Sequence, residues 1–184
     1  MDEPNINNEQ KTGQHSVYHP QVTKLIGSYD RNIDSKSRVG LPVQFREKLE
    51  DAPLILVPWM NRALAVFPES NWLPLAESIA QLDLYTPVGM TVRHQMFANA
   101  REVGLDKEGR IIVPPEMVDY ARLDGKVMVV GDWDKITIWN AVYFKDQVAV
   151  SETMVNQWFP SVMQIAKGQK RLEDLGNTAT KEDG

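Results

Sequence analysis

A five-residue motif that ends in arginine occurs twice in this chain, and each copy is followed by a short apolar run and a proline. The copies are Asp34-Ser35-Lys36-Ser37-Arg38, before Pro42, and Asp106-Lys107-Glu108-Gly109-Arg110, before Pro114. Every residue of the second copy lies 72 positions after its counterpart in the first. Asp, Ser and Gly between apolar segments favour turns. The motif therefore predicts two exposed turns that each present an arginine.

The same register continues on both sides of the motif. Ile33 corresponds to Leu105 before the turns, and the apolar run 54–57 corresponds to 126–129. The run 64–67 corresponds to 136–139, and Trp72 to Phe144. Few of these pairs are identities, but the apolar pattern and the turns recur, which is typical of duplicated structure. The chain is therefore predicted to hold two copies of one structural unit.

Each unit is predicted to fold as strand, turn, strand, short helix and two further strands. A proline follows the second strand of each unit, where its missing N–H suits the first turn of a helix. In the second unit the last two strands are predicted to flank a turn at 131–134, and Asn140 is predicted to cap a final helix. The expected strands are 24–33, 39–41, 54–57 and 63–67 in the first unit, and 101–105, 111–113, 127–130 and 136–139 in the second.

The chain is predicted to divide into five parts. Residues 1–23 are expected to form a disordered arm, because they are polar and have no hydrophobic period. The first repeat with its following helix spans 24–83, a connecting helix 84–98 and the second repeat 99–149. A C-terminal helix, expected at 152–166, and a tail occupy 150–184. Each repeat is near the lower size limit of a self-supporting core, so it is expected to need the other repeat or another subunit.

Composition argues against several classes of function. The chain has no Cys, which excludes disulfides, Cys-based zinc sites and thiol catalysis. His15, His19 and His94 are scattered without metal-ligand spacing. No nucleophile elbow or Gly-rich phosphate loop occurs. We therefore expect a protein that is not an enzyme, with no catalytic residue, metal, cofactor or small-molecule substrate. No apolar run approaches the roughly 20 residues of a membrane span, and no signal-peptide core is present, so a soluble cytoplasmic protein with no membrane partner is expected.

The charge distribution separates the two repeats. The net charge of −5 argues against a protein that simply coats nucleic acid. The first repeat is nevertheless locally basic, whereas Lys107 in the second motif is offset by Asp106 and Glu108. The cations of the first repeat are Lys24, Arg31, Lys36, Arg38, Arg46 and Lys48.

These units resemble the AbrB/SpoVT swapped-hairpin DNA-binding domain, which has D-x-x-G-R in its turn and a proline after its second strand. Two such units in one chain resemble the MraZ family of bacterial transcriptional regulators. The likeness covers about residues 25–148 and rests on 27–29, 32–38, 41–42, 45–46, 66–68, 72, 103–110, 113–114 and 138–139. The chain departs from the pattern at Ser37, where the turn usually has glycine. If that position needs a positive φ, serine is strained there.

The resemblance implies an α+β, mainly β fold: tandem pseudo-symmetric β-turn-β-helix-β-β repeats that form a double-ψ or swapped-hairpin, barrel-like core with flanking helices. It also implies a ring-shaped homo-oligomer in the cytoplasm, associated with the nucleoid. Its partner would be double-stranded DNA at tandem short guanine-containing repeats upstream of its own operon, in the division and cell-wall gene cluster. A weak basic patch repeated around a ring gains affinity through multivalency.

The candidate DNA-binding residues are Arg31, Ser35, Lys36, Ser37 and Arg38. Arg38 either reads guanine in the major groove or pairs with Asp34 to fix the turn, and the two roles are compatible. Lys36 and Arg31 are candidates for phosphate contacts, or are ordinary solvated charges. The two serines either donate to phosphates or only shape the turn.

A structural or subunit-contact role is expected for a second set of turn residues: Asp34, Asp106, Gly109 and Arg110. Arg110 is placed here because Asp106 and Glu108 make its surroundings unfavourable for phosphate. The alternative function is a non-enzymatic protein–protein scaffold, or an antitoxin-like module on the same fold. The acidic net charge supports this alternative.

Overall fold

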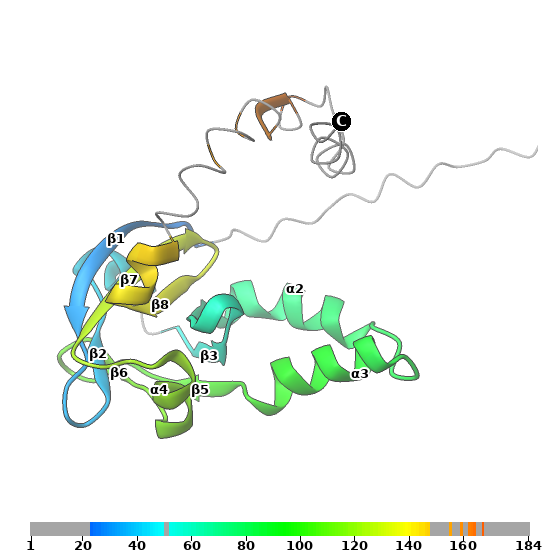
Figure 1. Cartoon of the computed structure of the whole chain (residues 1–184), viewed down its shortest axis with the longest axis horizontal. Coiled ribbons are helices and arrows are strands. Elements are labelled where there is room, and N and C mark those ends of the chain that lie inside the picture. The colour runs from blue at the N-terminus through cyan, green and yellow to red at the C-terminus, as the bar shows by residue number, and fades with distance from the viewer. Residues whose placement is uncertain are drawn as a thin grey trace, which may run out of the picture.

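The computed structural model describes residues 23–49 and 52–147, together with 155, 159, 162–164 and 167 (Figure 1). The elements of the first repeat are β1 (Leu25–Asn32), β2 (Arg38–Gly40), α1 (Val43–Leu49), β3 (Leu54–Pro58), the 3-10 turn η1 (Met60–Arg62), β4 (Leu64–Pro68) and α2 (Glu69–Ala80). Then follow α3 (Pro87–Arg93), the π-helical turn η2 (His94–Ala98), β5 (Arg101–Val103), β6 (Arg110–Ile112), α4 (Pro115–Ala121), β7 (Lys126–Trp133) and β8 (Ile136–Asn140). Residues 141–147 are helical.

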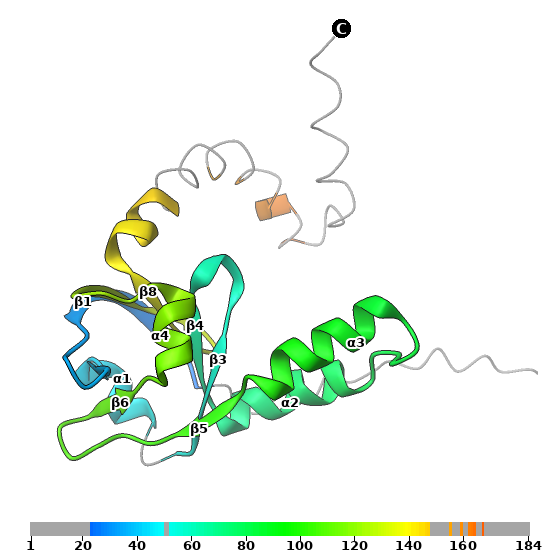
Figure 2. The same cartoon turned by 60° about the horizontal axis from the view of Figure 1, so that its bottom comes forward.

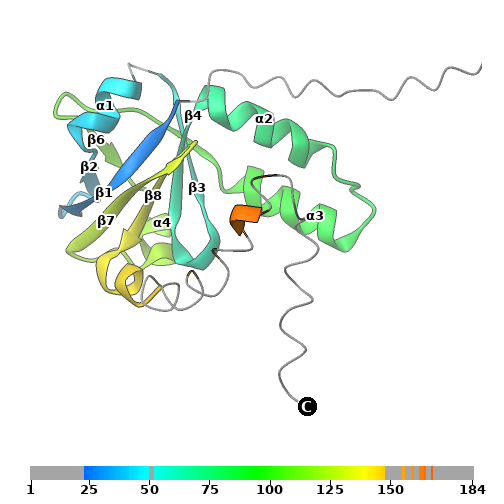
Figure 3. The ribbon, with the colours of Figure 1, turned by 90° about the horizontal axis from the view of Figure 1, so that it is seen from above.

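Both repeats contribute strands to one antiparallel six-stranded sheet, whose order is β1-β7-β8-β4-β3-β5. Figure 3 labels the first five of these strands. β3 pairs with β4, and β7 with β8, as the hairpin of each repeat. The first strand of each repeat, however, pairs with the hairpin of the other: β1 lies on β7 and β5 on β3. The repeats are thus interleaved.

The interleaved repeats are related by a pseudo-two-fold axis. In the pair β2–β6, Val39 lies opposite Ile111, and in the pair β4–β8, Ala65 lies opposite Thr137. Each of these pairs joins a residue to its own counterpart 72 positions later. Two backbone hydrogen bonds repeat in the same way, Leu41 N–H to Gly109 O at 3.0 Å and Val113 N–H to Ser37 O at 2.8 Å. The predicted duplication is confirmed.

The core is shared between the repeats. Phe45 of α1 and its counterpart Met117 of α4 are both fully buried in one cluster with Val39 and Ile111. Because side chains alternate across a strand, β3 and β4 also bury their other face. On that face Phe67 packs against Trp72 of α2, with ring centroids 5.5 Å apart. Burial on both faces explains why β3 and β4 are almost continuously apolar.

The α+β, mainly β class is confirmed, with helices beside an antiparallel sheet. The described strands do not close into the barrel-like core that the resemblance implied: β1 and β5 are the two edges of the large sheet, and β2 and β6 form a separate two-stranded ribbon. Helices α2 and α3 lie side by side as a hairpin that extends away from the sheet (Figure 2).

The structure contradicts one predicted turn and confirms one predicted helix cap. Residues 131–133 continue β7 instead of forming a turn, because they pair with Leu25, Ile26 and Gly27 of β1. The capping role of Asn140 is confirmed, since its Oδ1 accepts from the N–H groups of Val142 at 2.9 Å and Tyr143 at 3.2 Å. The predicted arm, residues 1–23, lies outside the described residues except for Thr23. So does the helix predicted over 152–166, except for residues 155, 159 and 162–164, which are helical.

Candidate nucleic-acid interface

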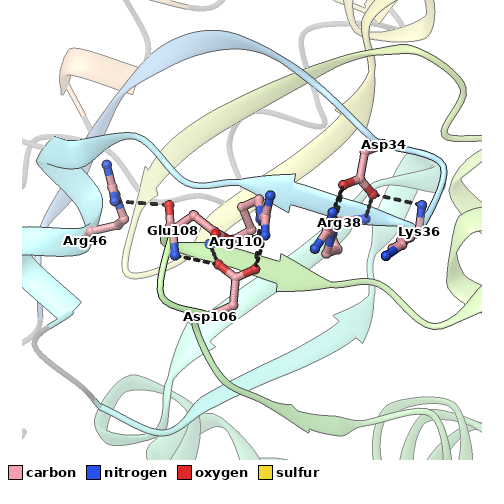
Figure 4. Close-up of polar contacts among 7 residues, drawn as sticks. All are labelled: Asp34, Lys36, Arg38, Arg46, Asp106, Glu108 and Arg110. Atoms are coloured by element: carbon pink, nitrogen blue, oxygen red, sulfur yellow. Dashed lines mark hydrogen bonds and ion pairs between the residues drawn. The ribbon is translucent and has the colours of Figure 1, made fainter.

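The two arginines of the motif project from the same two-stranded ribbon. Val39 and Ile111, at its centre, are completely buried. The residues before and after them in each strand point to the opposite face of the ribbon, because side chains alternate along a strand. Arg38 lies opposite Ile112, and Arg110 lies opposite Gly40. The outer face of the β2–β6 ribbon therefore carries Arg38 and Arg110, each preceded by its own turn (Figure 4).

The first turn is organised by the carboxylate of Asp34. Its Oδ1 accepts from the backbone N–H groups of Lys36 and Arg38, each at 2.9 Å. Its Oδ2 accepts from Arg38 Nε at 2.8 Å and forms an ion pair with Nη2 at 2.7 Å. Because the carboxylate accepts these bonds, the Arg38 side chain first among them, the pKa of Asp34 falls to about 2. The spacing D-x-x-x-R thus lets the aspartate carboxylate bond both the backbone and the side chain of the arginine four residues later.

The second turn repeats this geometry. Asp106 Oδ1 accepts from the N–H of Glu108 at 3.0 Å and of Arg110 at 2.9 Å. Oδ2 pairs with Arg110 Nε at 2.8 Å and Nη2 at 2.7 Å, and the Arg110 hydrogen bond lowers the pKa of Asp106 to about 2. Asp106 in turn raises the pKa of Arg110. Arg110 also bonds the carboxylate of Glu108, which has no acidic counterpart in the first turn.

The two guanidinium groups differ in what they can still bind. A guanidinium has five N–H donors. Asp34 engages Arg38 through Nε and Nη2, and three N–H groups are left for an outside acceptor. Arg110 uses a further donor on Glu108. Side-chain exposure is similar, 26% for Arg38 and 28% for Arg110, so the difference lies in charge and spare donors.

The tips of the two turns also differ. Ser37 and Gly109 occupy equivalent left-handed positions, with φ of 57° and 73°. Serine therefore stands in the backbone conformation for which the family pattern uses glycine. Arg46 of α1 lies against Gly109, and its Nη1 donates to Glu108 O at 3.3 Å (Figure 4). A Cβ on Gly109 would overlap the Arg46 side chain. The residue equivalent to Arg46 in the second repeat is Val118.

The structure brings four of the five candidate DNA-binding residues together. Ser35 and Lys36 are exposed at the first turn, beside the half-buried Ser37 and Arg38. Arg31 lies on β1 instead, where its guanidinium stacks 5.6 Å from the Tyr29 ring centroid. The contact of Arg46 with the second turn was not foreseen from the sequence, because Arg46 and Glu108 are 62 positions apart. The only sequence signal was the mismatch between Arg46 and Val118.

The described part of the chain lacks two features of other functional classes. Within residues 23–49 and 52–147 and the few described beyond them, no group of three His, Asp or Glu side chains is arranged to hold a metal ion. In the same residues, no helix combines the length and apolar character that crossing a bilayer requires.

Fold and site together define a two-repeat protein in which each repeat presents an Asp–Arg turn from a shared β-ribbon. The sequence model of the family described as "MraZ protein, putative antitoxin-like" matches residues 25–93 and 96–157. The chain belongs to the MraZ family.

The similarity to individual relatives covers most of the length of those relatives. A transcriptional regulator MraZ of Thermomicrobium roseum is 35% identical over 116 residues, 63% of this chain and 81% of the relative. The protein of that name from Leuconostoc mesenteroides is 37% identical over 117 residues, 64% of this chain and 81% of the relative. The one from Caldicellulosiruptor saccharolyticus is 32% identical over 152 residues, 83% of this chain and 99% of the relative.

Proposed function

We propose that this chain is a transcriptional regulator that binds double-stranded DNA in a sequence-specific manner. Its targets are tandem short repeats upstream of its own operon, in the division and cell-wall gene cluster. It acts as a ring-shaped homo-oligomer in the cytoplasm, at the nucleoid. The names of the relatives support regulation of transcription. The target and the ring rest on the family resemblance.

The observation that carries this proposal is the difference between the two turns. The first turn presents Lys36 with Arg38, which keeps spare donors, and its only carboxylate is already bonded to Arg38. The second turn carries an additional carboxylate, Glu108, and has Arg46 packed on its tip. The first turn has one acidic and two basic residues, whereas in the second Asp106 and Glu108 balance Lys107 and Arg110, so a phosphate backbone is attracted more strongly to the first. The first turn is therefore assigned to DNA and the second to structure or subunit contact.

The shape of the ribbon suits this role. The major groove admits a two-stranded β-ribbon, and arginine bonds both O6 and N7 of guanine there. One such bidentate contact is worth about 1–3 kcal/mol of discrimination against other bases. Asp34 holds the Arg38 side chain in one orientation, which lowers the entropy lost when the guanidinium binds. Lys36 and the hydroxyls of Ser35 and Ser37 are assigned to phosphate oxygens, which fix the position of the protein without reading sequence.

The apolar tip of the α2–α3 hairpin supports self-association. Leu84 is 50% exposed, Tyr85 is 98% exposed and Val88 is 73% exposed, and they cluster in sequence where the two helices meet. Apolar groups gathered on a projecting element mark interaction sites more often than free surface. In a ring, many first turns act together, and this multiplies the affinity of one weakly basic turn in an acidic chain.

A second candidate function is an antitoxin-like or scaffold module that binds protein. The description of the family as antitoxin-like favours it, as does the net charge of −5. The two functions predict different dependence on salt. Contact with phosphates releases counterions, so DNA affinity falls steeply as salt rises, whereas a protein scaffold has no such requirement.

Titration of the purified protein against two duplexes tests the proposal. One duplex is the region directly upstream of the gene that encodes this chain, and the other has the same bases in scrambled order. We expect tighter binding to the upstream duplex and a linear fall of log affinity with log salt. Absence of binding to either duplex at low salt would favour the scaffold. Equal binding to both would leave DNA binding without sequence specificity.

A further inference from the structure

Three cations from both repeats surround an open hollow beside the first turn. The hollow has a volume of about 330 Å³. It is lined by Asp30, Arg31 and Asn32 of β1, by Lys126 of β7, and by Ala141 and Lys145 of the last helix. One carboxylate among three cations leaves the lining positively charged, although the chain as a whole is acidic.

The cations of the hollow are available to a ligand. Lys126 and Lys145 are exposed, and neither is paired with a carboxylate among the described residues. The guanidinium of Arg31 is held in place by its stacking on Tyr29 and by Nη1, which donates to Asp30 O at 2.7 Å. That bond engages a backbone carbonyl and leaves the charge of Arg31 uncompensated. An anion is therefore the chemical class of ligand that this lining attracts.

The hollow adjoins the turn that is assigned to DNA. Lys126 lies opposite Asn32 in the β1–β7 pair, and Ile33 N–H donates to Gly125 O at 2.9 Å. Asp34 follows directly. Three residues of extended strand span about 10 Å, so Arg31 lies about that far along the chain from Asp34, where the turn begins. This distance equals the length of about three base pairs of duplex DNA. A duplex seated on the β2–β6 ribbon would bring its flanking phosphates within this range.

The pseudo-symmetric location lacks this charge. The counterparts of Arg31, Lys126 and Lys145, 72 positions away in the other repeat, are Val103, Leu54 and Leu73. The two places also differ in structure, since Lys126 is exposed and lies opposite Asn32, whereas Leu54 is buried and lies opposite Val103 instead of Gly104. The three cations thus lie next to the first turn, and the residues 72 positions away from them carry no charge.

We propose that Arg31, Lys126 and Lys145 form a phosphate-binding hollow for the DNA backbone next to the base-reading turn. The second repeat then contributes to DNA binding through Lys126 and Lys145, although its own turn does not. This inference rests on the proposed DNA-binding function. The hollow adds affinity without reading sequence, because phosphates are the same at every base pair.

The test is a double substitution, Lys126→Gln with Lys145→Gln, compared with the control Lys24→Gln with Lys107→Gln. Both variants remove two positive charges. Lys24 lies near the opposite end of β1, over the Trp133 ring, and Lys107 lies in the second turn. Affinity for the upstream and scrambled duplexes is measured at several salt concentrations, and native mass checks that both variants assemble as the unmodified protein does.

The hollow variant is expected to bind both duplexes several-fold more weakly, by the same factor, and to lower the salt slope by about two. The control is expected to retain the slope of the unmodified protein. Equal slopes for the two variants would overturn the hollow while leaving the base-reading turn intact. A larger loss on the upstream duplex than on the scrambled one would also overturn it, because a phosphate site does not discriminate bases. Failure of the unmodified protein to bind either duplex would overturn both proposals.

Discussion

Arg46 of the first repeat covers the buried Gly109 of the second, and a Cβ at this glycine would displace the end of the Arg46 side chain. The equivalent tip of the first turn is Ser37, which adopts the same left-handed backbone with a side chain. The two turns share the hydrogen bonds of their aspartates but differ in the side chains that cover their tips. One is closed by an arginine from the other repeat, and the other presents serine and lysine.

Exchange of the tip residues is expected to have opposite effects on stability. Ser37→Gly relieves a left-handed conformation that costs a side-chain-bearing residue about 1 kcal/mol, so it is expected to stabilise the fold by up to about that amount, less the greater unfolded-state entropy of glycine. Gly109→Ser introduces the same backbone cost and also displaces the end of the Arg46 side chain, so a loss of about 1–2 kcal/mol is expected. Urea unfolding of both variants measures these changes. Similar losses at the two positions would contradict the difference in cover.

Acid is expected to weaken the turns through their aspartates. Both Asp34 and Asp106 have a pKa lowered from 3.8 to about 2 by hydrogen bonds, from the Arg38 and Arg110 side chains respectively. A carboxylate whose folded pKa lies below its unfolded value stabilises the fold above the unfolded pKa. That contribution is lost as pH falls from 3.8 towards 2.

The double variant Asp34→Asn with Asp106→Asn isolates this effect. Its free energy of unfolding is compared with that of the unmodified protein between pH 6 and pH 2.5. The unmodified protein is expected to be the more stable at pH 6, and the difference is expected to shrink below pH 4. Asp124→Asn is the control, at an exposed position. A difference that stays constant with pH would show that the aspartates do not contribute as carboxylates.

The hairpin tip is expected to control assembly. Native mass of the unmodified protein is expected to be a single multiple of the 20.9 kDa chain. Replacement of Tyr85 and Val88 by serine removes exposed apolar surface and is expected to shift the mass towards the single chain. Ile26→Ser, at a residue that is 64% exposed on β1, is the control and should leave the mass unchanged. A monomeric unmodified protein at micromolar concentration would rule out the ring.

Local patterns predicted the elements better than their pairing. The proline after β2 and the spacing of Phe45 and Leu49 were sufficient to place α1, because helix starts and amphipathic faces are encoded within a few residues. The pairing of β1 with β7 joins distant parts of the chain, and nothing near Gly131 indicated that its strand would continue to Trp133. For the same reason the turn motif was visible in the sequence, whereas the cover of Gly109 by Arg46 and the hollow at Lys126 were not.

Base reading by the first turn is tested most directly with Arg38→Ala and Arg110→Ala. Each variant loses the same bonds to its turn aspartate, and Arg110→Ala also loses the bond to Glu108, so the control carries at least as much structural damage. The ratio of affinities for the upstream and scrambled duplexes is measured for both, and Arg38→Lys shows whether charge without the planar fork is enough. We expect the ratio to fall by roughly five- to 150-fold for Arg38→Ala, the equivalent of about 1–3 kcal/mol, and to be preserved for Arg110→Ala. An unchanged ratio for Arg38→Ala, or an equal fall for both, would contradict the assignment of base reading to the first turn.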